Sequence, residues 1–207
     1  AAKPFFLYLA HYGVHIPFEG RADVVERYRR NIRKEEPQNN PVYAAMVESI
    51  DESVGRLVRR VEAEGLTENT VFIFTSDNGG LSAAEGKGEK ATSNAPLKAG
   101  KGYLYEGGIR EPLFIVWPGV TKPRSQSDFP VISTDFYPTI AQMAGIGRTM
   151  GRPVDGVSLV PLLKGQKAVR RDTLYWHYPH YSNQGGRPGA AMREGDWKLI
   201  RWYEANE

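Results

Sequence analysis

Short apolar runs and one long amphipathic stretch dominate the first 80 residues. Residues 5–10 (FFLYLA) and 70–76 (TVFIFTS) are apolar or β-branched without interruption. Between them, from Asn40–Pro41 onward, apolar side chains recur at helical spacing. Asn40 suits a helix N-cap, Pro41 suits the first turn, and Gly65 suits the C-terminal stop. The pattern therefore predicts strand, helix, strand. The apolar helix positions are Tyr43, Met46, Val47, Ile50, Val54, Leu57, Val58 and Val61.

A second group of elements follows a long polar region. Residues 81–108 are rich in Gly, Lys, Glu and Ser and weakly patterned, which is typical of a functional or disordered loop. Residues 112–119 (PLFIVWPG) form another apolar run, 134–144 (TDFYPTIAQMA) predict a helix, and 159–163 predict a short one. Because strands that are apolar on both faces are typical of parallel sheets covered by helices, we expect an α/β fold with a mostly parallel sheet.

The pattern changes near residue 171. From Thr173 onward, aromatic and β-type runs flank the sequence Glu194–Gly195–Asp196, which predicts a small antiparallel sheet with a turn at that point. We therefore divide the chain into an α/β part, residues 1–170, and the start of a C-terminal antiparallel subdomain, residues 171–207.

Composition narrows the function classes. The chain has 207 residues, 41% of them hydrophobic and 25% charged, with 27 Lys and Arg against 24 Asp and Glu. A net charge of +3 without a basic block argues against nucleic acid as a partner, although it suits an anionic substrate. The chain has no cysteine, so disulfides, thiolate zinc sites and thiol nucleophiles are excluded. No apolar run approaches the ~20 residues of a membrane span, and we expect no membrane partner.

Several chemically capable side chains follow the predicted strands. In open α/β sheets, ligands bind beyond the carboxyl ends of the strands. Asp and Asn oxygens are hard ligands suited to calcium or magnesium, and neighbouring glycines let the backbone turn sharply beside an ion. The residues expected at this edge are His11 and His15, Asp77 and Asn78, and Lys98 and Lys101.

Each of these residues also has an ordinary explanation. Asn78–Gly79 is a common turn dipeptide, and Asp77 can cap that turn. His15 can be a loop histidine, and Lys101 can be a solvated surface charge among other lysines. Taken singly, none of them indicates a function.

The order and spacing of several segments together resemble the sulfatase family. The segments are FFLYLAHYGVHIPF, TVFIFTSDNGG, PLKAGKGYLYEGGIREPLFIVWPG, TDFYPTIAQMAG, DGVSLVPLLKG and MREGDWKLI. The resemblance covers nearly the whole chain, and EGGIREP downstream of SDNGG is its most specific part. It implies an alkaline-phosphatase-like fold and hydrolysis of sulfate esters.

The resemblance also implies roles for individual residues. Asp77 and Asn78 match two calcium ligands of the family, with magnesium as a possible replacement. His15 matches the histidine that faces the leaving oxygen, and Lys101 matches the lysine that holds sulfate oxygens. A dication and a lysine stabilise the negative charge that builds up on sulfate oxygens, and a histidine near neutral pH can donate a proton.

Two features of the family pattern are absent from these 207 residues. The family nucleophile is a formylglycine in a C/S-x-P-x-R motif, and an early pair of aspartates completes its calcium site. Neither occurs here. We therefore expect the chain to be the later part of a sulfatase, with the missing N-terminal half as its partner. Alone, we expect it to be inactive, and we expect the whole protein to be periplasmic or secreted.

The substrate is the least constrained expectation. Residues 176–189 (WHYPHYSNQGGRPG) offer aromatic and imidazole groups typical of carbohydrate contact, so His177 and His180 are candidate substrate-binding residues beside Lys101. The ordinary alternative is that the aromatic side chains simply pack against the core. A phosphate or phosphonate ester hydrolase of the same superfamily remains an alternative, as does a non-catalytic module that binds sulfated glycans.

Overall fold

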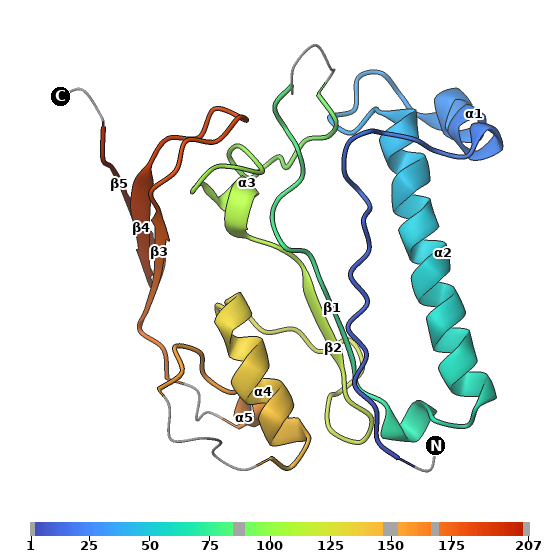
Figure 1. Ribbon diagram of the computed structural model, residues 1–207, viewed down its shortest axis with the longest axis vertical. Coiled ribbons are helices and arrows are strands. Elements are labelled where there is room, and N and C mark those ends of the chain that lie inside the picture. The colour runs from blue at the N-terminus through green and yellow to red at the C-terminus, as the bar shows by residue number, and fades with distance from the viewer. Residues whose placement is uncertain (1–2, 85–89, 147–152, 167–169, 205–207) are drawn as a thin grey trace.

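The computed structural model describes residues 3–84, 90–146, 153–166 and 170–204. Figure 1 shows the α1–α2 helix pair on one side, the β1–β2 ribbon in the middle, and α4, α5 and a C-terminal sheet on the other side. In chain order the elements are α1 (Ala22–Asn31), α2 (Pro41–Ala63), the 3-10 turn η1 (Thr67–Asn69), β1 (Phe72–Thr75), α3 (Glu106–Ile109), β2 (Leu113–Val116), the 3-10 turn η2 (Ser133–Asp135), α4 (Phe136–Met143), α5 (Val160–Leu163), β3 (Thr173–Tyr178), β4 (Gly189–Glu194) and β5 (Trp197–Trp202).

The long helix α2 confirms the helix that the amphipathic stretch predicts. Asn40 caps it, since its side-chain oxygen accepts hydrogen bonds from the backbone N–H groups of Val42 and Tyr43, both at 3.0 Å. Gly65 follows the helix with a φ of +66°, the left-handed geometry that glycine adopts without a steric penalty. Helix α1 packs across α2, and Val24 and Val25 meet Ala45 in a small buried cluster.

The expectation of a mostly parallel sheet is wrong. Strands β1 and β2 pair antiparallel, with Phe72 opposite Val116 and Thr75 opposite Leu113, and the described residues contain no parallel pairing. A parallel pair requires a crossover that returns the chain to the starting end, usually through a helix. Only the four-residue α3 lies between β1 and β2 in the described part of that connection, so the chain re-enters at the end where it left.

The expectation that these strands are buried on both faces is also wrong. Phe114 on β2 is 62% exposed. The FFLYLA segment, which the pattern predicts as a strand, pairs with no strand in the described structure, and its Phe6 and Tyr8 residues are 72% and 81% exposed. Within the described chain, these apolar side chains therefore lack the covering layer that their composition predicts.

The C-terminal antiparallel sheet is confirmed. It has the order β3–β4–β5, with Thr173 opposite Glu194 at one end and Tyr178 opposite Gly189 at the other. Gly195 turns the chain between β4 and β5 with a φ of +54°. The helices expected near 134–144 and 159–163 are also present as α4 and α5. None of the helices in the described segments has both the length and the apolar content of a membrane span.

Candidate functional site

The turn after β1 is built against α3 through contacts that only glycine permits. The Gly79 N–H donates to the carbonyl of Gly108 at 3.1 Å. A Cβ added to Gly79 would lie 1.7 Å from the Gly107 carbonyl oxygen, so no side chain fits there. This close approach explains Gly79, the first of the two glycines that follow Asp77 and Asn78, and it holds the turn against α3.

The loop that carries Lys101 joins the same turn. The Lys101 N–H donates to the Gly80 carbonyl at 3.2 Å. Asn94 clamps both segments, because its side-chain oxygen accepts from the Gly80 N–H at 3.1 Å while its amide donates to the carbonyls of Gly80 and Ala99 at 2.9 and 3.0 Å. Two stretches separated by about twenty residues are thereby held together.

His15 and Lys101 are in direct contact. His15 Nε2 lies 2.8 Å from Lys101 Nζ, and His15 Nδ1 lies 2.9 Å from the carbonyl oxygen of Ile16. Because a carbonyl only accepts, this network assigns the ring proton to Nδ1, and Nε2 accepts from the lysine ammonium. The predicted acid and the predicted sulfate-holding cation therefore form one hydrogen-bonded pair, and Lys101 joins this pair to the Asp77–Asn78 turn.

A further acidic residue lies beside Asp77. Glu111, at the entry to β2, has one carboxylate oxygen that is buried and makes no hydrogen bond within the described part of the chain. Burial, reinforced by the negative charge of Asp77, raises the pKa of Glu111 to about 7. Burial also raises the pKa of Tyr43, with a smaller contribution from the Glu111 charge. The Asp77 charge therefore lies near a carboxyl group that holds its proton more tightly than usual, and the described residues form no salt bridge with either group.

The donor chemistry of this turn suits a hard dication but does not complete a site for one. Asp77 and Asn78 supply two oxygen-bearing side chains, and one oxygen of Glu111 has no hydrogen-bond partner within the described structure. Calcium takes about six to eight oxygens. Among the described residues, no cluster of three or more His, Cys, Asp or Glu side chains is arranged to hold a metal.

The two C-terminal histidines occupy a separate sheet. His177 on β3 has its Nδ1 2.7 Å from the Tyr203 hydroxyl, and the His180 ring packs edge-on against Tyr178 with centroids 5.3 Å apart. Neither histidine contacts the His15–Lys101 pair. His180 nevertheless lies in the β3–β4 loop, residues 179–188, which packs on the Lys101 loop.

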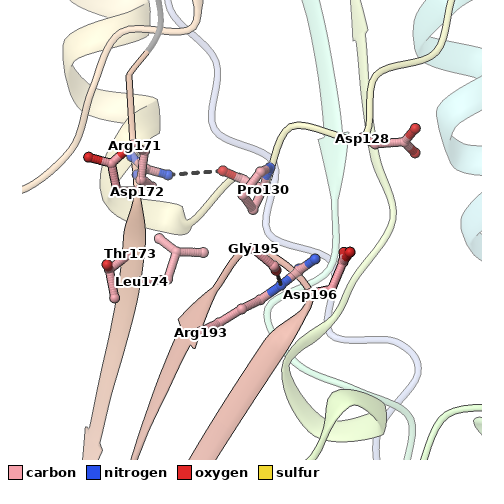
Figure 2. Close-up of a pocket in the computed structure, with 9 residues that line it drawn as sticks. All are labelled: Asp128, Pro130, Arg171, Asp172, Thr173, Leu174, Arg193, Gly195 and Asp196. Carbon is pink, nitrogen blue, oxygen red and sulfur yellow. Dashed lines mark hydrogen bonds between the residues drawn. The ribbon is translucent and has the colours of Figure 1, made fainter.

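A hollow of about 200 Å³ lies at the other end of the C-terminal sheet (Figure 2). Arg171 beside it donates to the Pro130 carbonyl at 3.1 Å and to the buried Asp135 at 2.7 Å, so its charge is already paired. Six residues of β3, at about 3.3 Å each, separate this end from the β3–β4 loop. The hollow is therefore distinct from the Lys101 region. Its lining residues are Asp128, Pro130, Arg171, Asp172, Thr173, Leu174, Arg193, Gly195 and Asp196.

Sequence reasoning missed Asn94 and Glu111 as individual residues. Glu111 belongs to the EGGIREP motif, and that motif was the available signal. Asn94 had none, because its three hydrogen bonds depend on the tertiary approach of two loops.

Comparison with known families agrees with this geometry. The family model described as "Sulfatase" matches residues 1–146, and the model "N-sulphoglucosamine sulphohydrolase, C-terminal" matches residues 99–207. The first match alone covers more than half of the chain. The chain belongs to the sulfatase family, and the matches place it in the C-terminal portion of that architecture.

Particular relatives support the assignment. A sulfatase of Formosa agariphila is 35% identical over 99% of this chain, and human arylsulfatase A is 34% identical over 95%. The chain spans 39% and 35% of the lengths of these two relatives.

Solved structures show the same fold. Ps i-CgsB, crystallised in complex with k-i-k-neocarrahexaose, superposes with a TM-score of 0.82 at 31% identity. The match covers 100% of this chain and 43% of the Ps i-CgsB chain. BT4656, in complex with its substrate D-glucosamine-2-N,6-O-disulfate, gives a TM-score of 0.66 at 28% identity and covers 90% of this chain and 37% of its own. The fold is therefore a partial alkaline-phosphatase-like sulfatase fold.

Proposed function

We propose that this chain is the later part of a sulfuric ester hydrolase that acts on sulfated carbohydrates. The observation that carries the proposal is the contact between His15 Nε2 and Lys101 Nζ at 2.8 Å, held beside the Asp77–Asn78 turn by the Lys101–Gly80 backbone hydrogen bond. In this proposal the whole protein is periplasmic or secreted.

His15 and Lys101 serve the two ends of the ester bond. The Lys101 ammonium neutralises charge on sulfate oxygens, and the leaving oxygen takes its proton from the His15–Lys101 pair, since a proton can be held at either Nε2 or Nζ. Asp77 and Asn78 would hold the dication. When present, calcium would neutralise sulfate charge, and a formylglycine supplied by residues outside this chain would provide the nucleophile.

The substrate class follows from the relatives and from the site's charge. Two similar structures hold a carrageenan-type oligosaccharide and a disulfated glucosamine. The described chain adds the exposed side chains of His180 and Tyr181, which suit a sugar ring and belong to the β3–β4 loop that packs on the Lys101 loop. A sulfated glycan is therefore the substrate class that we propose.

The test is an aryl sulfate assay with added calcium on two proteins. One is the 207-residue chain, and the other is a version extended upstream by the family's formylglycine segment. We expect turnover only from the extended version, and we expect His15→Ala and Lys101→Ala to reduce it about 10²-fold or more. Arg56→Gln on the outer surface of α2 serves as the control.

Three outcomes would contradict the proposal in different ways. Preference for an aryl phosphate or phosphonate would favour the related ester hydrolases. Glycan binding by the extended version without turnover would favour a binding module. Turnover by the 207-residue chain that His15→Ala abolishes would show that the nucleophile lies within it.

A further inference from the structure

The β3–β4 loop, residues 179–188, is locked onto the loop that carries Lys101. A Cβ on Gly186 would lie 1.8 Å from the Gly102 carbonyl oxygen, and one on Gly102 would lie 2.1 Å from the Ser182 hydroxyl. The Tyr103 hydroxyl donates to the Gln184 carbonyl at 2.6 Å. The two loops therefore touch backbone to backbone, with no space for a side chain between them.

The contact between the two loops also brings the backbone of Arg187 close to that of Lys101. It is the neighbour of Gly186, just as Lys101 is the neighbour of Gly102, and consecutive Cα atoms are only about 3.8 Å apart. Both side chains therefore start within a few residue lengths of each other on adjoining loops. The Arg187 side chain is exposed. An arginine side chain extends far enough for its guanidinium to reach a ligand that Lys101 also contacts.

The positive charge of Arg187 also has no partner among the described residues. Many exposed arginines of this chain are paired with carboxylates, for example Arg29 with Glu26 at 2.7 Å and Arg60 with Glu64 at 2.6 Å. Within the described segments, by contrast, Arg187 has no ion pair, hydrogen bond or ring contact. The β3–β4 loop itself contains no acidic residue.

Two positive side chains on adjoining loops repel each other unless an anion lies between or beside them. Lys101 also lacks a carboxylate partner among the described residues and is held by His15 alone. A ligand with one anionic group at Lys101 leaves the Arg187 charge without a partner, whereas a ligand with a second anionic group gives each of the two cations its own counter-charge. The planar guanidinium suits a second sulfate or a carboxylate, because it can donate two parallel hydrogen bonds.

We infer that Arg187 determines specificity by binding a second anionic group, a sulfate or a carboxylate, on the glycan whose sulfate ester lies at Lys101. This inference rests on the proposed function and deepens it: the preferred substrates are sugars with at least two anionic substituents. Arg187 contacts the substrate away from the cleaved bond, so it selects the ligand without taking part in the chemistry.

The experiment measures binding of three probes to the 207-residue chain by calorimetry at one fixed ionic strength. The probes are a monosulfated disaccharide, its disulfated counterpart, and a monosulfated disaccharide that carries a uronic acid. We expect the wild-type chain to bind the two dianionic probes about tenfold more tightly than the monosulfated one, which is the size of one charge-assisted contact. The two dianionic probes distinguish sulfate from carboxylate as the second group.

Arg187→Gln is expected to bring the dianionic and monosulfated affinities to within about twofold of each other, and Arg187→Lys to restore part of the difference. Arg56→Gln removes the same charge from α2, and we expect it to keep the preference, which separates a specific contact from a general effect of net charge. Thermal unfolding followed by circular dichroism checks that all variants fold alike.

The outcomes separate the inference from the function it rests on. If Lys101→Ala weakens the binding of every probe but Arg187→Gln leaves the preference for dianionic probes intact, the specificity role of Arg187 is wrong and the proposed function stands. If the monosulfated probe binds equally well to wild type and Lys101→Ala, the proposed function itself is wrong. Absence of measurable binding of any probe both to the wild-type chain and to the upstream-extended version used in the aryl sulfate assay would overturn both.

Discussion

Replacing Glu111 by Gln tests the electrostatics of the candidate site. The carboxyl group has one buried oxygen without a hydrogen-bond partner in the described structure, and burial together with the Asp77 charge raises its pKa from 4.5 to about 7. The folded protein therefore binds this proton more tightly than the unfolded chain does. The amide of Glu111→Gln keeps the shape and does not titrate.

The sign of the effect follows from proton linkage. Between pH 4.5 and about 7, the native state holds more protons than the unfolded state at this position, so the free energy of unfolding falls as the pH rises. At about 1.4 kcal/mol per pKa unit, the ceiling of this loss is about 3.4 kcal/mol. Because Glu111 is only partly buried, solvent screening reduces the expected loss to about 1–2 kcal/mol.

Urea denaturation from pH 4 to 9, with a chelator present, measures this loss. We expect wild type to lose about 1–2 kcal/mol relative to Glu111→Gln between pH 4.5 and 8, with no further relative change above that pH. Asp77→Asn should narrow the pH range of this loss, because it removes the second cause of the raised pKa of Glu111. Parallel pH profiles for wild type and Glu111→Gln would refute the reasoning, since the carboxyl would then titrate alike in both states.

Three other substitutions, one of them with a matched control, have expected outcomes that urea denaturation can measure. Asp135→Asn should cost about 3–5 kcal/mol, because Asp135 is fully buried and the change leaves its arginine partner without a counter-charge; a loss below 1 kcal/mol would contradict this. Gly79→Ala should cost about 3 kcal/mol or more, because the new methyl group would overlap a backbone carbonyl of α3, whereas Gly55→Ala within α2, where the nearest atom is a flexible side chain at 3.2 Å, should be tolerated. Tyr103→Phe should cost about 1 kcal/mol through the lost bond to the Gln184 carbonyl, and unchanged stability would mean that this bond does not anchor the β3–β4 loop.

Local patterns in the sequence determined the elements that stand on their own. Helix α2 could be predicted to within a residue because its apolar stripe, its Asn40 cap and its Gly65 stop all act within one or two turns of the chain. The C-terminal sheet was equally readable, since alternating strands and the Gly195 turn require only neighbours in sequence. The family resemblance assigns roles to His15, Lys101, Asp77 and Asn78 from sequence motifs alone.

Tertiary structure alone decided the pairing direction and the assembly of the site. An apolar run reads the same in a parallel and an antiparallel sheet, so the direction of β2 depended on where the loop returned it. Glu111 comes next to Asp77 only because β2 runs back from that end. Asn94 and the glycine contacts act between segments far apart in sequence, where close approach of backbones, and no local propensity, sets the geometry.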